Sequence, residues 1–285
     1  MKQQDKDSIR KAVMEYSDRY SSRNKAAASL GISPATLSAI INGKDELISE
    51  EMWKGLRSKV CSGTEGWSIV ETSAYQEITV ALRDAQEYRN VRWIVGEAGC
   101  GKTTTAGIYG SENREVFTVL CDEDMRKGDF VREIAGKLGI KTAGSRLRDI
   151  LEMSIDALIR MKSPLLIFDE GDKLNDNVFH YFINIYNRLE GKCGIVFLST
   201  DYICHRIESG LRYNKKGYNE IYSRIGRKFF ELEATSANDV MAICAANGIE
   251  DRKAISEVIE NTQASGFDLR VVKTSIHRQK RMSRL

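Results

Sequence analysis

A glycine-rich segment between an apolar run and a helical pattern limits the possible folds most strongly. Gly96, Gly101, Lys102 and Thr103 fit the spacing G-x-x-x-x-G-K-T, directly after the apolar residues 93–95. Glycines let backbone N–H groups curl around phosphate oxygens, and the N-terminus of the following helix points its partial positive charge at them. The pattern predicts a phosphate-binding loop between a strand and a helix. A chance glycine-rich turn is the competing interpretation, and the flanking patterns disfavour it.

Each residue type in this loop has an expected task. Lys102 should reach the β- and γ-phosphates of ATP, and the Thr103 hydroxyl should ligate Mg²⁺. We expect the nucleotide to contact the whole segment: Gly96, Glu97, Ala98, Gly99, Cys100, Gly101, Lys102, Thr103 and Thr104.

A second motif combines apolar residues with two carboxylates. The run 165–168 is followed directly by Asp169 and Glu170. Charge at the end of a buried strand is costly unless a cation lies there. We therefore expect Asp169 to hold Mg²⁺ through water and Glu170 to polarise the attacking water. A solvated strand end is the alternative.

The spacing of apolar runs indicates the fold class. Five short runs read as buried parallel strands, and helical patterns separate them, as in a doubly wound α/β domain. These runs are 92–95, 116–121, 165–169, 194–199 and 229–232. The division that we predict is a helix-turn-helix domain at 1–62, a linker of turn composition at 63–75, an ATPase core at 76–233 and a helical lid at 234–285.

The segment 23–43 fits a helix-turn-helix. Alanines pack its first helix closely, Gly31 permits the tight turn, and Ser33 with Pro34 caps and starts the second helix. Polar side chains of that second helix are expected to be exposed and able to meet DNA: Thr36, Ser38 and Asn42. A three-helix bundle used for protein contact is the alternative.

Charge and composition exclude several classes of protein. The formal net charge is only +3, but no acidic residue follows Asp268. That end of the chain is basic and could touch nucleic acid, an acidic partner or only solvent: Arg270, Lys273, Arg278, Lys280, Arg281 and Arg284.

The six cysteines form no CxxC pair, and no apolar run approaches the length of a membrane span. We expect a cytoplasmic protein without a membrane segment.

The order of these elements resembles that of AAA+ ATPases. Over roughly residues 1–285 the chain resembles the phage Mu B transposition protein family, with IstB- and TnsC-like proteins as more distant relatives. The resemblance rests on the helix-turn-helix, the phosphate loop, the strand end 169–172, the Ser-Arg-Ile segment 223–225 and the Leu-Arg pair 269–270. It implies a parallel five-stranded sheet, a small helical lid, ATP and Mg²⁺.

Further site residues come from this resemblance alone. It implies that Thr200, or alternatively Ser199, is the polar sensor-1 residue, although the family usually has asparagine there. An ordinary strand-end cap is the other interpretation. Arg224, with Arg227 as second choice, corresponds to the arginine finger that reaches a neighbouring subunit's γ-phosphate; a surface salt bridge is its alternative. Arg270 corresponds to a sensor-2 residue near the nucleotide.

The resemblance also implies partners. Proteins of this family bind double-stranded DNA without sequence preference in the presence of ATP, form helical filaments and deliver target DNA to a transposase. Basic loops of the core are then expected to track the DNA backbone, with solvated charge as an equal alternative: Arg126, Lys127, Lys141, Arg146 and Arg148. The basic and aromatic loop 206–217 could contact DNA or a neighbouring subunit.

Two other functions fit parts of the pattern. One is a helix-turn-helix transcription regulator whose ATPase domain only senses nucleotide, and the other is a helicase loader of the DnaC type. Glu170 argues for turnover and against a pure sensor. The N-terminal helix-turn-helix argues against a loader.

Overall fold

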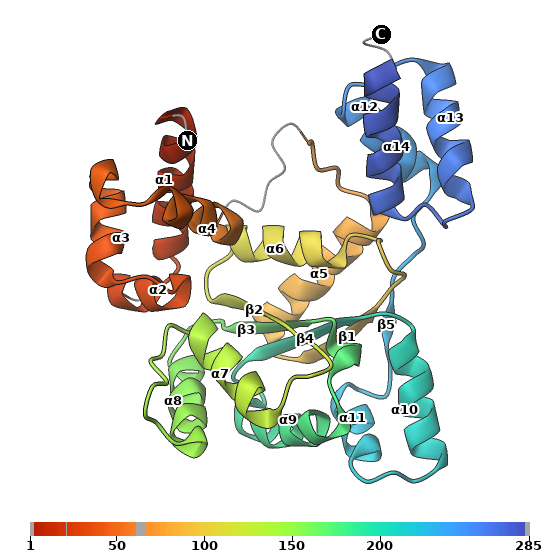
Figure 1. Ribbon diagram of the computed structural model, residues 1–285. Coiled ribbons are helices and arrows are strands. Elements are labelled where there is room, and N and C mark those ends of the chain that lie inside the picture. The colour runs from red at the N-terminus through yellow and green to blue at the C-terminus, as the bar shows by residue number, and fades with distance from the viewer. Residues whose placement is uncertain (1–2, 21, 61–66, 283–285) are drawn as a thin grey trace.

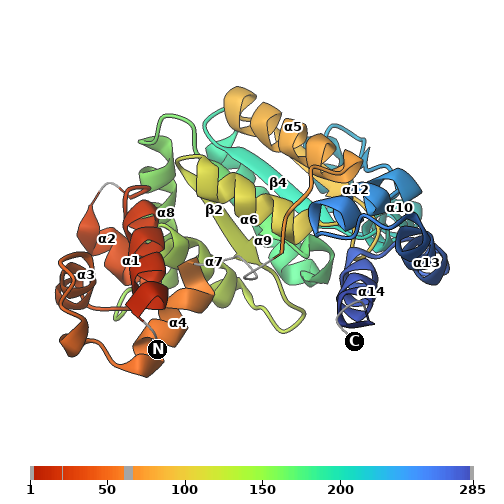
Figure 2. The same ribbon diagram turned by 90° about the horizontal axis from the view of Figure 1, so that it is seen from above.

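The computed structural model describes residues 3–20, 22–60 and 67–282. A central sheet is covered by helices on both faces, and two helical parts flank it (Figure 1). Seen from above, the N-terminal helices and the C-terminal helices lie beyond opposite ends of the sheet (Figure 2). No helix within the described segments is long and apolar enough to cross a membrane.

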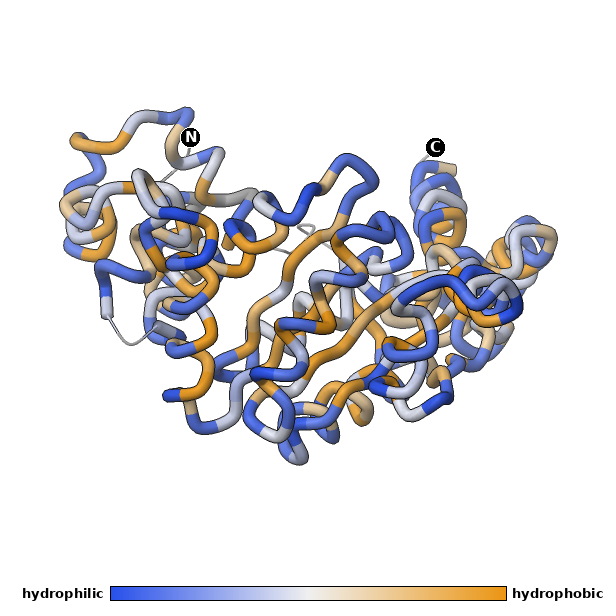
Figure 3. The backbone as a smooth tube through the Cα atoms, turned by 90° about the horizontal axis from the view of Figure 1, so that it is seen from below, coloured by the Kyte–Doolittle hydropathy of each residue, from blue (hydrophilic) through white to orange (hydrophobic). Residues whose placement is uncertain are grey.

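The sheet has five parallel strands in the order β2-β3-β4-β1-β5, which confirms the predicted α/β class. Its strands are β1 (Val91–Val95), β2 (Val116–Leu120), β3 (Leu165–Asp169), β4 (Gly194–Ser199) and β5 (Phe230–Glu231). All residues of β3 and β4 are buried, as expected for central parallel strands covered on both faces. Figure 3 shows these strands as apolar stretches inside a more polar shell.

Helices cover the two faces unequally. The upper face in Figure 1 carries α5 (Ser73–Tyr88) and α6 (Lys102–Glu112). The lower face carries five helices: α7 (Lys127–Lys137), α8 (Leu147–Ile159), α9 (Asp176–Leu189), α10 (Tyr202–Arg212) and α11 (Tyr218–Arg224). Under the sheet, stacked aromatic rings cross from strand to strand, with ring centroids 4.2 Å apart for Trp93–Phe197 and 5.0 Å for Phe168–Phe197. This packing fixes the strand register on which the site depends.

The N-terminal part contains α1 (Gln3–Ser17), α2 (Arg23–Leu30), α3 (Pro34–Ile41) and α4 (Glu50–Val60). The predicted turn chemistry is confirmed. Gly31 is left-handed at φ 68° after α2, and the Ser33 hydroxyl accepts the Thr36 backbone N–H at the start of α3. The expected exposure is only partly right, because Thr36 and Ser38 are half-buried and only Asn42 is exposed.

The helix-turn-helix part is docked on the ATPase core. The Tyr20 hydroxyl donates to the Lys137 carbonyl at 2.9 Å, and its ring lies 6.4 Å from that of Phe117. At Gly139, with φ +69°, an added Cβ would lie 2.4 Å from the Lys25 carbonyl oxygen. Only glycine therefore allows this close approach of the two parts.

The predicted linker at 63–75 needs correction. Residues 61–66 lie outside the described residues, whereas 67–72 pack on the C-terminal helices and α5 already begins at Ser73. The Ser68 N–H donates to Asn247 Oδ1 at 2.9 Å, and the Asn247 amide donates back to the Ser68 carbonyl at 3.0 Å. Segment 67–72 is therefore a fixed strap. Its partners are α12 (Ala237–Ala246), α13 (Arg252–Gln263) and α14 (Leu269–Met282), which form the C-terminal part.

Candidate active site

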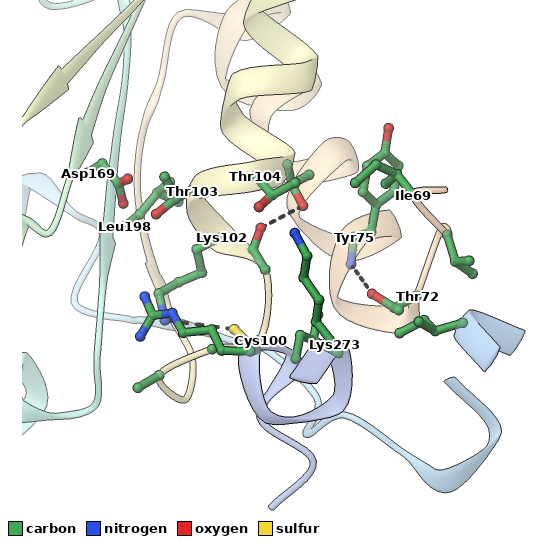
Figure 4. A pocket seen from close by; sticks show the side chains of 18 of the residues that line it. Ile69, Thr72, Tyr75, Cys100, Lys102, Thr103, Thr104, Asp169, Leu198 and Lys273 are labelled. Carbon is green, nitrogen blue, oxygen red and sulfur yellow. Dashed lines mark hydrogen bonds between the residues drawn. The ribbon is translucent and has the colours of Figure 1, made fainter. Parts of the chain in front are cut away.

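A cavity of about 670 Å³ opens at the carboxyl ends of the central strands. The phosphate-loop residues 98–104, Asp169, Glu170, Thr200 and Arg270 all line it. The structure thus brings together most of the residues that were predicted from separate motifs. Figure 4 shows Lys102, Thr103 and Thr104 at the start of α6, with Asp169 on one side and Lys273 of α14 on the other.

The phosphate loop has the backbone geometry that its glycines predict. Gly99 and Gly101 have φ values of 78° and 101°, in the region that L side chains rarely adopt. Gly101 is the N-cap of α6, so the first N–H groups of that helix face the cavity. The Lys102 ammonium donates to the carbonyls of Gly96 at 2.6 Å and Glu97 at 2.8 Å. It also donates to the Cys100 sulfur at 3.7 Å. Because these acceptors in the loop are neutral, the charge of Lys102 remains for an anion.

Asp169 is a buried carboxylate at the end of β3, with 3% of its surface exposed. Burial raises its pKa, while a hydrogen bond from Thr103 and one from the Glu170 backbone N–H lower it. Within the described part of the chain no Lys or Arg forms an ion pair with it. The Lys102 charge also lowers this pKa, but without forming an ion pair. A carboxylate beside a hydroxyl suits Mg²⁺, which takes few protein ligands and completes its shell with water and phosphate oxygens.

Glu170 lies just beyond the strand, in a left-handed conformation with φ 56°. Its carboxylate lines the cavity and forms a 2.5 Å ion pair with Lys173. That hydrogen bond raises the pKa of the Lys173 ammonium. The side chains are about 41% and 43% exposed, so the pair contributes little to stability. Glu170 is therefore free to exchange this partner for water.

The two sensor-1 candidates differ in what their hydroxyls do. Ser199 is buried, and its hydroxyl accepts the indole N–H of Trp93 at 2.9 Å. The Thr200 hydroxyl donates to Asp172 at 2.6 Å. Thr200 is only half-buried and borders the cavity next to the loop that follows Glu170. Thr200 is therefore better placed than Ser199 to contact a ligand.

The site includes residues that were not predicted from the sequence. The strap contributes Trp67, Ile69, Val70 and Thr72, and α5 contributes Tyr75. These side chains give the cavity an apolar wall away from the phosphate loop. The single Trp in a segment of turn composition was the only signal in the sequence.

The C-terminal part (α12–α14), predicted as the lid, forms one wall of the cavity. The Leu269 N–H at the start of α14 donates to the Gly99 carbonyl at 3.1 Å. A Cβ on Gly99 would lie 2.1 Å from Asp268 Oδ1, so the loop and lid touch directly. Arg270 borders the cavity as predicted, and Lys273, which was not predicted, does so one turn later. Lys273 also lies 5.2 Å above the Trp67 ring.

Arg224 lies away from this cavity. It borders a hollow formed by residues 89–92 and 189–195, at the amino ends of β1 and β4. The length of β4 puts these ends roughly 16 Å from the carboxyl ends of the strands. Arg227 is exposed and also outside the cavity. Neither arginine therefore borders the nucleotide cavity of its own subunit.

The predicted DNA-binding cations lie at the two ends of α7 and at the start of α8. Arg126 is the N-cap of α7 and Lys127 its first residue, while Lys141 follows its end. All five cations are exposed, and none of them is in an ion pair of the described residues. One expectation was wrong: Arg148 lies in the first turn of α8 and not in the loop, and Arg146 is the N-cap of that helix.

The expected loop 206–217 also needs correction, because residues up to Arg212 belong to α10. Arg206 donates to the carbonyls of Asp172 and Leu174, at 3.0 and 2.6 Å, and to the Asp176 carboxylate at 2.6 Å. Arg206 therefore fixes the segment after Glu170. Only residues 212–216 of this region are exposed throughout.

Residues 85–207 match the family model of the AAA domain. This chain contains an AAA ATPase domain. The matched region of the AAA domain runs from the end of α5 into α10 and includes the phosphate loop, Asp169 and Glu170.

Relatives of known role are similar beyond the AAA domain. The ATP-dependent target DNA activator B of Escherichia phage Mu is 24% identical over 255 residues, which cover 86% of this chain and 79% of that protein. The activator B of Escherichia phage D108 is 24% identical over 246 residues, covering 82% and 76%. The chain is thus distantly related to these activators.

A solved structure supports the fold alone. The ORC1 protein of Aeropyrum pernix, solved in complex with DNA, superimposes with a TM-score of 0.54 at 15% identity. The match covers 74% of this chain and 59% of that one. It places the AAA domain among α/β folds of the same architecture.

The buried charge of Asp169 leads to a first prediction. Because burial raises its native pKa above the unfolded value, the native state holds this proton more tightly. The stability of the metal-free protein should fall as pH rises from the unfolded pKa through the native pKa. Asp169→Asn keeps the shape and removes the charge, so it should melt a few degrees higher at pH 7 without Mg²⁺. The same variant should lose the added stability that Mg²⁺ with ATP gives the parent.

Thermal unfolding from pH 4 to 8, with and without Mg²⁺ and ATP, measures both effects. Asp172→Asn is a suitable control, because that carboxylate is more exposed and already accepts the Thr200 hydroxyl. A metal-free Asp169→Asn protein with the parental pH profile would contradict the assignment of an unpaired buried charge.

Proposed function

We propose that this chain is an ATP-dependent, sequence-tolerant DNA-binding ATPase that assembles on double-stranded DNA and delivers that DNA to a transposase or activates it. The observation that carries the proposal is the similarity to the two phage target DNA activators over more than four-fifths of the chain. The nucleotide cavity, with every predicted phosphate-loop residue from Ala98 to Thr104 on its wall, supports the ATP-dependent part.

In this proposal the residues of the phosphate loop bind and orient the triphosphate. The N–H groups at the start of α6 and the Lys102 ammonium hold the β- and γ-phosphates. Thr103 and Asp169 would hold Mg²⁺, which supplies positive charge next to the transferring phosphoryl group. Arg270 and Lys273 bring two further cations from the lid to the same cavity. The apolar wall around Trp67 and Tyr75 receives the base.

Glu170 is proposed as the residue that orients the attacking water. Its carboxylate borders the cavity, and Glu170 directly follows Asp169, the proposed Mg²⁺ ligand, in the chain. To do so it has to exchange the Lys173 ammonium for the water. Thr200 keeps Asp172 in place through its 2.6 Å hydrogen bond, which holds the loop after Glu170.

Assembly completes the site in this proposal. Arg224 lies at the opposite ends of the strands from its own cavity, so it is available only to the nucleotide of a neighbouring subunit. A head-to-tail interface of that kind repeats from subunit to subunit and generates a ring or a helical filament.

The core loops, and not α3, are the proposed DNA contacts. The exposed cations at the ends of α7 and the start of α8 are free of ion pairs among the described residues. In contrast, α3 has the sequence PATLSAII and carries no cation. Phosphate contacts without base readout produce binding that tolerates any sequence and depends strongly on salt.

DNA binding tests this proposal directly. The parent should bind random duplex DNA only with ATP or a non-hydrolysable analogue. In the double variant Arg146→Ala/Arg148→Ala, all duplexes should bind more weakly by a similar factor. The slope of the logarithm of the DNA-binding constant against the logarithm of salt concentration should become less steep by about 2, because each lost phosphate contact contributes about 0.9. Fluorescence anisotropy over a salt series measures both quantities.

Arg132→Ala provides the matched control, since it removes an exposed arginine of α7 that is already paired with Asp129 at 3.7 Å. An unchanged slope in the double variant would move the contact elsewhere. A single operator bound far above random DNA would favour a helix-turn-helix transcription regulator instead.

A further inference from the structure

The arginines of this chain fall into two groups by the charge of their partners. Several are paired with carboxylates: Arg10 with Asp45 at 2.6 Å, Arg92 with Asp84 at 2.8 Å, Arg206 with Asp176 at 2.6 Å, and Arg188 with Glu152. Their charge is compensated within the subunit. Arg224 is held at longer distances, 3.0 to 3.4 Å, and by neutral groups alone among the contacts of the described residues.

Asn187 is the main partner of Arg224. Its Oδ1 accepts from Nη2 at 3.0 Å and from Nε at 3.3 Å, so the amide grips one edge of the guanidinium. Arginine has no acceptor, so the oxygen and not the nitrogen of this amide must face it. The third nitrogen, Nη1, is 3.4 Å from the Glu220 carbonyl in the preceding turn of α11.

An aromatic ring supports the same guanidinium from one side. The central carbon of the Arg224 guanidinium lies 5.5 Å from the centroid of the Tyr186 ring. The Tyr186 hydroxyl donates to Glu190 at 3.0 Å, which keeps the ring from turning away. The guanidinium therefore has a defined orientation while remaining partly exposed.

Neutral partners orient a cation without cancelling its charge. A carboxylate at the place of Asn187 would form a bidentate ion pair, as in the Arg188–Glu152 contact. A phosphate of another molecule would then have to break that pair before it could bind. An amide imposes only the smaller cost of a neutral hydrogen bond.

We propose that Asn187 is a positioning residue that presents Arg224, with its charge uncompensated, to the nucleotide of a neighbouring subunit. This inference rests on the proposed function, because it takes Arg224 as the arginine that completes the neighbour's site. Asn187 lies in the last turn of α9, whose first residue, Asp176, is bound by Arg206 close to the loop after Glu170. The helix thus ties the position of Arg224 to the subunit's own catalytic loop.

Asn187→Asp is the decisive variant, because it changes the charge of the partner and almost nothing of its shape. At saturating ATP and at protein concentrations that give full assembly, its kcat should fall at least about tenfold, with KM for ATP and the melting temperature unchanged. Asn187→Ala loses the grip but keeps the arginine's charge free, so its kcat should fall less. A merely structural role of Asn187 would lower the melting temperature and would make the Ala variant the worse of the two.

Asn219→Asp is the matched control. Asn219, in the first turn of α11, accepts from Arg227, which follows that helix, at 3.4 Å. This variant therefore puts the same new carboxylate beside the other candidate arginine. Its kcat should stay at the parental value. A fall as large as that of Asn187→Asp would assign the role to Arg227 and overturn the inference.

A double variant separates this inference from the proposed function. If Asn187 acts through Arg224, adding Asn187→Asp to Arg224→Ala should change kcat no further. A further fall would show that Asn187 acts elsewhere. Arg224→Ala with parental activity would contradict the proposed role of Arg224 itself. Reduced activity in Arg224→Ala together with parental activity in Asn187→Asp would overturn the inference about Asn187 and leave the proposed function in place.

Discussion

ATP hydrolysis by Arg224→Ala is expected to be roughly 10³- to 10⁵-fold slower than that of the parent, with ATP affinity unchanged. An arginine supplied by a neighbour stabilises the charge that develops on the transferring phosphoryl group, and its loss costs a rate factor of about that size. Binding should survive, because Arg224 lies at the other end of the strands from the cavity of its own subunit. Steady-state hydrolysis over a range of protein concentrations, with nucleotide binding measured separately, checks both parts.

Mixing two inactive variants gives a sharper result. Lys102→Ala lacks the phosphate-loop ammonium but keeps Arg224, and Arg224→Ala has the opposite defect. In a head-to-tail assembly at equal ratio, about one interface in four combines an intact loop with an intact arginine. The mixture should therefore recover up to about one quarter of the parental rate. A mixture that co-assembles and stays inactive would exclude Arg224 as the shared residue.

Glu170→Gln is expected to bind ATP normally and to hydrolyse it about 10²- to 10⁴-fold more slowly, the usual loss when a general base is removed. Glutamine keeps the shape but cannot take a proton from water, and it also loses the ion pair with Lys173. Since hydrolysis is blocked and ATP is retained, assemblies on DNA should persist for longer. Single-turnover hydrolysis and the lifetime of the DNA complex measure the two effects.

Glu123→Gln is the control for that experiment. Glu123 is an exposed carboxylate whose charge also acts on Lys173, but it does not line the cavity. Its hydrolysis rate should match the parent. If Glu170→Gln turned over as fast as this control, the water would be oriented by another group.

The parts of the site that local sequence determines were predictable. The loop 96–103 and the strand end at Asp169 each consist of contiguous residues whose types follow from backbone geometry and charge burial. The capped turn at Gly31 and Ser33 was predictable for the same reason. The fold class required only the alternation of apolar runs and helices, because that alternation is typical of a parallel sheet with helices on both faces.

Residues that reach the site through tertiary packing were not predictable. Trp67 lies in a segment of turn composition, which by itself indicates a linker. It becomes part of the cavity only because Asn247, far away in the chain, binds the backbone of Ser68. Lys273 looked like one of many cations of a basic tail until α14 placed it over Trp67. The contact of Asn187 with Arg224 likewise joins two helices that are separate in sequence.

The position of Trp67 gives this protein an intrinsic optical reporter. The chain has three tryptophans, and both Trp53 and Trp93 are almost fully buried, at 0% and 1% exposure, and do not line the cavity. Trp67 alone borders the cavity, with the Lys273 ammonium above its ring and the His277 ring edge-on at 5.6 Å. Indole emission responds to a nearby charge and to a stacked base, so the emission of the unlabelled protein should report on the nucleotide site through Trp67.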